Sequence, residues 1–592
     1  MPAGASPAYK ADVLPASPIA ALARWLGCVL AISALAAEAL AQGQSLDDRG
    51  RQLASRIGCA QCHSGVQAAP NFRELPPELS FAGLRYHTAW LFDYLMNPVR
   101  VRQHLGAARM PDFRLDEREA LALALFLETQ RQVAGNWPST PAGLEVRANS
   151  VAGVSREAFH TELTGGGLAC LTCHDYAGQG GHRALELTNV SARLRPEWIA
   201  DYLVAPAKFG VAASNMPAQF FQVMPDRTRF QEVRPRAAES VSRIAAHLSG
   251  LHPERRIGLD KTLAEAKRRH PAVTAGQGEA LFRALNCVAC HRHHAIAPRA
   301  EAAPSLAGEG LRVNKLWLEA FLARPTPVRP SGFHPGDGAR MPDFKLKPDE
   351  VSALGGWLTG QREGPAALQS EYRAAPRSVF ALRKAETLLR DKLSCLGCHA
   401  LDGKGGRVGP DLAHARQRLK PNYVLNVILD PRSTAPHSIM PRAPVPEATA
   451  RLIADYLLHQ RPADSTPGYL SPLELGLALP AGGVVAVASS RAVTNYARYC
   501  AACHGAAGGA DGFNAAFLPV KPTRHADALA MGLRPDDTLF DGIHGGGAVL
   551  NKSHRMPAWQ GTLSGDEMRE LVRYMRTLCR CEGPEWSRDG TR

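Results

Sequence analysis

Five short stretches of this sequence each place two thiols and an imidazole within five residues. The pattern C-x-x-C-H occupies Cys59, Cys62 and His63; Cys170, Cys173 and His174; Cys287, Cys290 and His291; Cys395, Cys398 and His399; and Cys500, Cys503 and His504. Cysteines at this spacing form half of a zinc site, a thiol–disulfide centre or, with the adjacent histidine, the attachment of a c-type haem. Because ten of the thirteen cysteines belong to complete copies of the pattern, the sequence favours haem.

The zinc and thioredoxin interpretations lack what their chemistry requires. No motif has a second close cysteine pair that would complete a tetrahedral zinc site. The β-α-β pattern that surrounds a thioredoxin motif is also absent. A haem, by contrast, uses both cysteines for thioether bonds and the histidine as the proximal ligand of its iron.

A methionine followed by proline comes after every motif. Met110, Met216, Met341, Met440 and Met556 lie 41 to 52 residues beyond the histidine of their motif, in a chain with only eleven methionines. A thioether opposite the imidazole gives a high-potential electron-transfer haem, and the proline stiffens the loop that presents the sulfur. We therefore expect five His/Met pairs of axial ligands.

The second motif has two candidate distal ligands, because Met224 is also followed by proline. Met216 lies 10 residues past Pro206, within the range of 9 to 16 set by three other units, whereas Met224 lies 18 past it. Spacing to the last helix of the unit favours Met224 instead. We prefer Met216, because an insertion after the ligand leaves the haem crevice intact.

Helical patterns recur at fixed places around the motifs. An aromatic residue stands eight residues before a proline in four units, at Trp90 and Pro98, Trp198 and Pro206, Trp317 and Pro325, and Tyr423 and Pro431. The residues between them have apolar side chains at helical spacing, and the proline marks the end of the helix. Similar patterns precede each motif and follow each methionine. The sequence therefore predicts an all-α fold.

These residues resemble class I cytochrome c domains, in five copies that cover nearly all of the chain after residue 41. The resemblance implies small all-α domains whose first and last helices cross, with haem c in the crevice between them. It also implies that the five motif histidines are proximal ligands, the five Met-Pro methionines distal ligands, and the ten motif cysteines the covalent attachments of five haems.

The spacing of the motifs predicts the domain boundaries. We expect domains at residues 45–137, 151–257, 266–365, 372–462 and 488–582, with a linker at 463–487. The first and third units share the sequence ARMPDF, and the second and fourth share CL-x-CH followed by a glycine-rich turn. This pattern indicates a two-domain module duplicated once. The fifth unit resembles single-domain cytochromes and the cytochrome subunits of periplasmic alcohol dehydrogenases.

Residues 1–41 have the features of a secretory signal peptide, with an apolar run before Ala39-Leu40-Ala41, in which the small residues Ala39 and Ala41 fit a cleavage site. An uncleaved membrane anchor is the alternative, but the run falls short of the about 20 apolar residues of a full span. No later segment is long and apolar enough to cross a bilayer. We therefore expect a periplasmic protein.

The formal net charge is +14, and haem propionates would offset most of it. Export and the lack of a clustered basic stripe argue against nucleic acid as a partner. The remaining charge favours docking to redox proteins with acidic surfaces.

Three functions fit the sequence. The first is a pentahaem electron carrier between a donor dehydrogenase or carrier and an acceptor. The second is the cytochrome subunit of a periplasmic dehydrogenase complex. The third is a haem enzyme of the peroxidase or thiosulfate-oxidising type, which needs a labile sixth ligand. Since every unit has a candidate methionine, the sequence offers no open iron site, and an electron-transfer protein without its own substrate site is favoured.

Two smaller expectations concern residues outside the axial set. Cys579 and Cys581, which are separated by one residue, are expected to be free or linked to a partner rather than to form a local disulfide. His293 and His294 could approach a haem propionate or replace Met341 as a ligand, but we expect them to be solvated at the surface.

Overall fold

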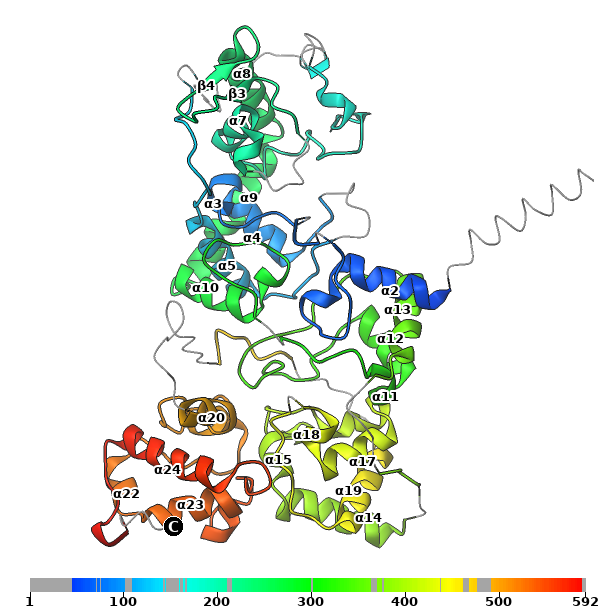
Figure 1. The fold of residues 1–592 in the computed structure, drawn as a ribbon, viewed down its shortest axis with the longest axis vertical. Helices are drawn as coiled ribbons and strands as arrows, with labels where there is room; N and C mark the ends of the chain where they lie inside the picture. Colours follow the sequence, from blue (N-terminus) through cyan, green and yellow to red (C-terminus); the bar gives the residue numbers. More distant parts are fainter. Residues whose placement is uncertain are drawn as a thin grey trace, which may run out of the picture.

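The fold is described from a computed structural model of the chain (Figure 1). The structure describes residues 45–587 except 71, 75, 102–108, 142–143, 145–158, 160–162, 165–167, 210–215, 300–301, 364–369, 375–376, 437, 461–467 and 476–490. The predicted signal peptide and most of the predicted linker lie outside the described residues.

The predicted all-α class is confirmed. The helices of the first two units are α2 (Leu46–Ile57), α3 (Ala82–Arg85), α4 (Thr88–Met96), α5 (Glu117–Thr129), α7 (Pro196–Val204), α8 (Ala237–Gly250) and α9 (Pro253–Arg269). Those of the third and fourth are α10 (Ala275–Ala284), α11 (Glu309–Arg312), α12 (Lys315–Ala323), α13 (Pro348–Gly360), α14 (Val379–Thr387), α15 (Cys395–Cys398), α16 (Ala415–Arg418), α17 (Pro421–Leu429), α18 (Pro431–Thr434) and α19 (Glu447–His459). The fifth has α20 (Arg491–Tyr499), α21 (Ala501–His504), α22 (Ala528–Gly532), α23 (Asp536–Gly545) and α24 (Gly565–Cys579).

Strands occur in the described residues only as three short antiparallel hairpins. They pair β1 (Asp175–Tyr176) with β2 (Gln179–Gly180), β3 (Phe221–Val223) with β4 (Phe230–Glu232), and β5 (Ala400–Leu401) with β6 (Lys404–Gly405). The first and third hairpins directly follow the second and fourth C-x-x-C-H motifs. The β3–β4 hairpin lies in the extra sequence that separates Met216 from α8.

The helix ends follow from local sequence. Helix α5 begins at a capping box, in which the Asp116 carboxylate accepts from the backbone N–H of Glu119 and the Glu119 carboxylate accepts from that of Asp116. Helices α4, α7, α12 and α17 are the predicted aromatic-to-proline helices, and each stops two residues before its proline. Among the described residues, no helix combines the length and the apolar character that a membrane span needs.

The first and last helices of the first and third units cross, but the pairs are exchanged. Helix α10 packs on α5, where the rings of Phe282 and Phe126 lie 5.2 Å apart, and α2 packs on α13 (Figure 1). A Cβ on Gly278 would lie 1.9 Å from the carbonyl oxygen of Ala122, and one on Gly50 would lie 2.2 Å from that of Ala353. Each crossing therefore depends on a glycine at the contact, and both cross the boundaries predicted for these two units.

We call the two resulting bodies lobe A and lobe B. Lobe A contains α10, the third motif, residues 77–96, the Met110 loop and α5. Lobe B contains α2, the first motif, residues 302–323, the Met341 loop and α13. One hydrophobic core joins lobe A to the second unit, a second core joins lobe B to the fourth unit, and a third lies in the fifth unit.

An isolated antiparallel β-bridge joins each lobe to its neighbouring unit. In lobe A the isolated bridge Tyr86–Leu194 reaches the second unit, and in lobe B the bridge Val313–Leu419 reaches the fourth. Reciprocal N–H···O bonds flank both bridges, with N···O distances of 2.9 to 3.0 Å. The same type of contact therefore joins lobe A to the second unit and lobe B to the fourth.

Cys579 and Cys581 form a disulfide, so the expectation that they would not bridge locally is wrong. Arg580 between them has a left-handed backbone (φ 51°) that ends α24 and turns the chain back. The two Cα atoms lie 5.1 Å apart, within the usual range for a disulfide.

His293 also departs from expectation, because it is half-buried in lobe A. Its ring stacks on Phe126 and its Nε2 lies 2.9 Å from the side-chain oxygen of Gln130. Burial, with the nearby His294 and Arg283, lowers the pKa of His293 to about 4. His294 is exposed, as expected.

Candidate haem-binding sites

Each C-x-x-C-H motif forms one turn of helix. The first three begin with short 3₁₀ turns at Cys59–Gln61, Cys170–Thr172 and Cys287–Ala289, and the other two form the α-helical turns α15 and α21. In all five, the backbone N–H of the histidine donates to the carbonyl of the first cysteine. This turn places the two sulfurs and the imidazole of a motif close together.

All five motif histidines have the same hydrogen bond on one ring nitrogen. The Nδ1–H groups of His63, His174, His291, His399 and His504 donate to backbone carbonyls at 2.6 to 2.8 Å. A donating Nδ1 fixes the tautomer and leaves the Nε2 lone pair for a metal. Burial lowers the pKa of His63, His174, His399 and His504, which favours the neutral imidazole that a metal requires.

The carbonyl partners separate the five sites into two kinds. In the second and fourth units the acceptor lies 11 residues beyond the histidine, at Leu185 and Pro410. In the first and third units the acceptors are exchanged, so that His63 donates to Pro304 and His291 donates to Pro77. The exchange seen in the helices therefore extends to the second coordination sphere of the candidate metal site.

Four of the predicted methionine ligands line one continuous cavity of about 1530 Å³. The cavity wall includes Met110, Met216, Met341 and Met440, the cysteines and histidines of the first four motifs, and Cys503 of the fifth. Met224 is not part of this wall, because it lies at the turn between β3 and β4. Met216 instead packs on the same core as Cys170, which keeps it the better candidate for the second site.

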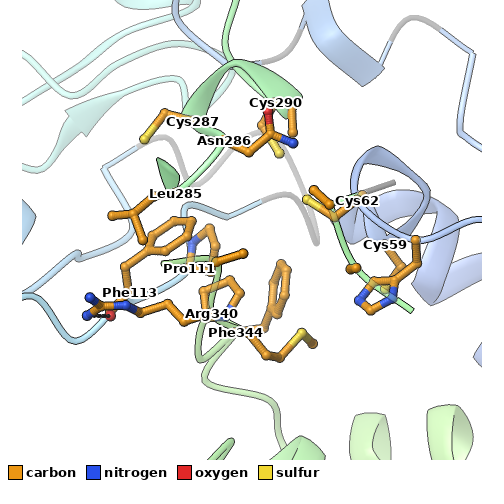
Figure 2. A pocket seen from close by; sticks show the side chains of 18 of the residues that line it. Cys59, Cys62, Pro111, Phe113, Leu285, Asn286, Cys287, Cys290, Arg340 and Phe344 are labelled. Atoms are coloured by element: carbon orange, nitrogen blue, oxygen red, sulfur yellow. Dashed lines mark hydrogen bonds between the residues drawn. The ribbon is translucent and has the colours of Figure 1, made fainter. Parts of the chain in front are cut away.

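Lobes A and B meet where their motifs face each other (Figure 2). Pro111 and Phe113 lie toward Leu285 and Cys287, and Phe113 packs on the core of lobe A. Cys290 and Cys62 lie near each other (Figure 2). Burial, and to a smaller extent the nearby Cys62 thiol, raises the pKa of Cys290 to about 12. The first and third motifs are therefore neighbours in space.

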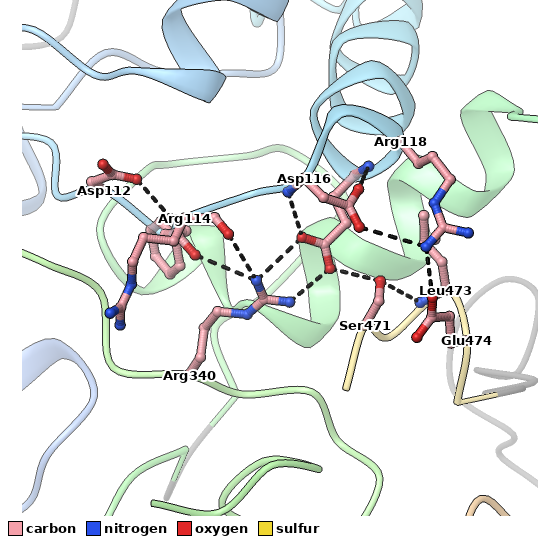
Figure 3. Close-up of polar contacts among 10 residues, drawn as sticks. Asp112, Arg114, Asp116, Arg118, Arg340, Ser471, Leu473 and Glu474 are labelled. Carbon is pink, nitrogen blue, oxygen red and sulfur yellow. Dashed lines mark hydrogen bonds and ion pairs between the residues drawn. The ribbon is translucent and has the colours of Figure 1, made fainter. Parts of the chain in front are cut away.

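The two methionine loops run side by side at this junction and are tied by reciprocal ion pairs. Asp112 and Asp343 form an antiparallel bridge, with two N···O distances of 2.7 Å. Arg340, labelled in Figure 3 with its polar contacts, binds Glu119 of α5 at 2.7 Å, and Arg109 binds Glu350 of α13 at 2.6 Å. Each arginine directly precedes a candidate methionine ligand and binds the glutamate that caps the last helix of the other lobe.

Part of the predicted linker packs over this junction. The hydroxyl of Ser471 (Figure 3) donates to the Glu119 carboxylate at 2.7 Å. The ring of Tyr469 lies 5.0 Å from the guanidinium of Arg340. Residues 468–475 are thus docked on the lobes rather than acting as a free connection.

Cationic side chains along the cavity suit the propionates of haem. Arg312, Arg329 and Arg418 line the cavity between the first and fourth motifs, and Arg312 forms an ion pair with Glu309. Burial, together with Arg329 and Arg312, lowers the pKa of Arg418 to about 10. In lobe A, Nε of Arg85 is buried without a hydrogen-bond partner. Buried cations need counter-charges, and haem carboxylates would supply them.

The donor set argues against an ordinary metal ion. Among the described residues, no three His, Cys, Asp or Glu side chains gather where they could bind one. The paired thiols, the oriented imidazoles and the apolar cavity with cationic edges therefore fit a haem, whose iron would take a motif histidine and a methionine.

The fifth site has a feature that sequence analysis missed. His525 stacks on His504 with ring centroids 4.1 Å apart, and its Nδ1 lies 2.9 Å from the hydroxyl of Tyr496. No motif marks His525, which lies 21 residues beyond His504. The arginines at the inter-unit bridges were also missed, although Leu-Arg or Arg-Leu pairs recur at 84–85, 193–194, 311–312 and 418–419.

Comparison with known families matches two parts of the chain. Residues 275–360 match the cytochrome c family, and residues 488–575 match the family of cytochrome c oxidase, cbb3-type, subunit III. No curated protein and no solved structure matches the chain. These two matches support a c-type cytochrome, and cytochrome c domains imply electron transfer by covalently bound haem c.

Proposed function

We propose that the chain is a periplasmic pentahaem cytochrome that carries electrons between a donor dehydrogenase or carrier and an acceptor. The observation that supports five haems is the common histidine geometry, since all five Nδ1 groups donate to backbone carbonyls. The histidines His63, His174, His291, His399 and His504 would be the proximal ligands, and Met110, Met216, Met341, Met440 and Met556 the distal ones.

Conduction between haems is supported by the proximity of the motifs. Cys62 and Cys290 are neighbours at the lobe junction. In the fourth and fifth units, the Asn514 amide donates to the carbonyl of Gly397 at 2.8 Å and contacts the sulfur of Cys503 at 3.2 Å. Tunnelling falls steeply with distance, so neighbouring motifs favour an electron path over isolated centres.

The number of haems can be measured on the mature protein. Intact mass should show five covalently attached haems, and haem staining after denaturing electrophoresis should show that they remain bound. A fully matured protein with four or fewer would contradict the proposal. Cell fractionation should place the protein in the periplasm with residues 1–41 removed.

A haem enzyme would need an iron with an exchangeable ligand. We expect the reduced protein to bind carbon monoxide poorly at neutral pH, because each iron has a sulfur ligand. Strong binding at one haem would support the enzyme instead of the carrier.

The match of the fifth unit to an oxidase subunit favours a second candidate, the cytochrome subunit of a larger redox complex. The net charge of +14 supports partners with acidic docking surfaces. Purification from the native host at low ionic strength, with chemical cross-linking, would distinguish a stable complex from a free carrier. A complex that survives high salt would favour the second candidate.

A further inference from the structure

The cavity between lobes A and B raises the question of which methionine faces which motif. The order of the sequence pairs His63 with Met110 and His291 with Met341. The family match at 275–360 also encloses His291 and Met341 in one continuous stretch. The structure separates the members of both pairs.

Met110 lies in the lobe that holds the third motif. Its side chain and that of Phe113 pack on the core of lobe A, as does Cys287. Cys59 of the first motif packs on the other core, with Phe344 and Leu346 from the loop that follows Met341. The arginine before each methionine binds the opposite lobe. Arg109 of lobe A binds Glu350 in lobe B, and Arg340 of lobe B binds Glu119 in lobe A.

The chain crosses between lobes in two short segments. Phe72 lies against Gly58 of lobe B, where a Cβ would be 2.3 Å from its ring, and five residues later Pro77 accepts from His291 in lobe A. The return crossing lies between Ile296, in the core of lobe A, and Pro304, which accepts from His63 in lobe B. Within each of these two units, the described residues after the crossing, including the methionine and the last helix, belong to the other lobe.

We propose that the first and third haems exchange their distal ligands. The haem on Cys59 and Cys62 would take His63 and Met341, and the haem on Cys287 and Cys290 would take His291 and Met110. This assignment rests on the proposed His/Met haems and adds the pairing of their ligands.

The exchange also changes the order of the haems along the molecule. Lobe A, with the third haem, joins the second unit through Tyr86–Leu194, and lobe B, with the first haem, joins the fourth unit through Val313–Leu419. The fourth unit contacts the fifth through Asn514. The haems, numbered by motif, would therefore run 2–3–1–4–5 and not 1–2–3–4–5.

The pairing can be tested by removing one haem and then replacing one methionine in the full-length holoprotein. In a Cys287→Ser/Cys290→Ser background, Met110→His should leave every remaining haem unchanged, because its haem is already absent. Met341→His in that background should abolish one sulfur-to-iron charge-transfer band and lower one reduction potential. In a Cys59→Ser/Cys62→Ser background the two substitutions should exchange their effects.

Opposite results in both backgrounds would establish pairing in the order of the sequence and overturn the exchange. Met224→His, away from the cavity wall, is the matched control and should be silent in every background. If neither Met110→His nor Met341→His changes any haem in the otherwise intact protein, these methionines are not ligands. That result would contradict the proposed His/Met haems, whereas a reversed pattern in the two backgrounds would contradict only the exchanged pairing.

Variants without a haem can fail to fold, so a second measurement uses the intact holoprotein. A crystal or cryo-electron microscopy structure would show the sulfur bound to each iron directly. Density that joins Met341 to the iron of the Cys59 haem would support the exchange, and density that joins Met110 to it would overturn it.

Discussion

In the second and fourth units the motif histidine is hydrogen-bonded by residues of the same unit, whereas in the first and third units it is hydrogen-bonded by residues of the other one. In the second and fourth, a hairpin turns the chain back immediately after the motif, and the acceptor carbonyl follows 11 residues after the histidine. Gly180 and Gly405 make this return possible, because a Cβ would lie 2.3 Å from the carbonyl oxygen of His174 or 2.4 Å from that of His399.

In the part of the first and third units that the structure describes, no such hairpin follows the motif. Their motifs are followed by stretches with Pro70, Pro76 and Pro77, or with Pro298 and Pro304. Proline fixes its own φ and favours extended backbone in the residue before it. The comparison indicates that the turn directly after a C-x-x-C-H motif decides whether a unit closes on itself or reaches its neighbour.

The largest expected effect concerns the path of electrons across the exchanged lobes. Removal of the third haem by Cys287→Ser/Cys290→Ser should isolate the second haem from the first, fourth and fifth, because lobe A stands between them. Stopped-flow reduction by a partner that docks on the fifth unit should then leave one of the four remaining haems in a slow phase. A slow phase of two haems would instead indicate that the haems follow the order of the sequence. Cys170→Ser/Cys173→Ser, which removes a terminal haem, should give no slow phase.

The two ion pairs at the lobe junction should differ in their contribution to stability. Arg340 and Glu119 have side chains 3% and 2% exposed, whereas Arg109 and Glu350 are 12% and 16% exposed. Arg340→Ala should lower the free energy of unfolding by about 3 to 5 kcal/mol, because it leaves a buried carboxylate without its partner. Arg109→Ala should cost less, since water reaches Glu350. Chemical denaturation of the two variants would measure the difference, and equal losses would contradict the argument.

The glycine at each helix crossing should tolerate no side chain. Gly278→Ala places a Cβ 1.9 Å from the Ala122 carbonyl oxygen, so the helices must separate. We expect a loss of about 1 to 3 kcal/mol in unfolding free energy. Gly276→Ala on the same helix is the matched control, because its Cβ would have no neighbour nearer than 3.8 Å. Thermal unfolding should show that this control is as stable as the parent or more stable, since alanine favours helix.

A double-mutant cycle can show which last helix packs on α10. Phe282→Ala and Phe126→Ala should couple by about 0.5 to 1.5 kcal/mol, as expected for a packed aromatic pair. Phe282→Ala and Trp357→Ala should be additive, although Trp357 follows Phe282 in the same sequence unit. Coupling to Trp357 and additivity with Phe126, measured by equilibrium denaturation, would show that the units close on themselves.

The parts of the structure that were predictable from sequence are those that depend on local patterns. The motif turns follow from the spacing of cysteine and histidine, and α4, α7, α12 and α17 follow from apolar periodicity and a terminal proline. The resemblance to class I cytochromes added the crossing of first and last helices. The family matches support haem c, while the individual ligand residues remain predictions.

Within the first and third units, the residues themselves do not show which unit supplies the partner, because either arrangement uses the same residue types. Pro77 lies 14 residues after His63, and Pro304 lies 13 residues after His291, so each histidine has an equivalent carbonyl in its own unit. The shared ARMPDF sequences make the two methionine loops interchangeable in the same way. The sequence also could not predict side-chain contacts that form only when distant segments pack together, such as the contact between Gln130 and His293.

The smallest expected effect is the pH dependence of the ion pair between Arg109 and Glu350. Burial alone would raise the pKa of Glu350, but hydrogen bonds from Arg109 and from the backbone N–H of Lys347 outweigh it and hold the pKa below its ordinary value. A carboxyl group whose pKa is lowered by folding stabilises the folded state above its unfolded pKa, about 4.3 for glutamate. That contribution is lost as the pH falls through the lowered folded value.

The parent should therefore lose stability more steeply than Arg109→Ala below about pH 4, in denaturation curves measured from pH 7 downward. Glu350→Gln is the control for this pair, because it has no carboxyl group at position 350 to titrate and should show the same shallower slope as Arg109→Ala. If Arg109→Ala keeps the parent's slope, the charge of Glu350 does not depend on the arginine from the other lobe, and the ion pair between Arg109 and Glu350 does not contribute to the junction of the two methionine loops.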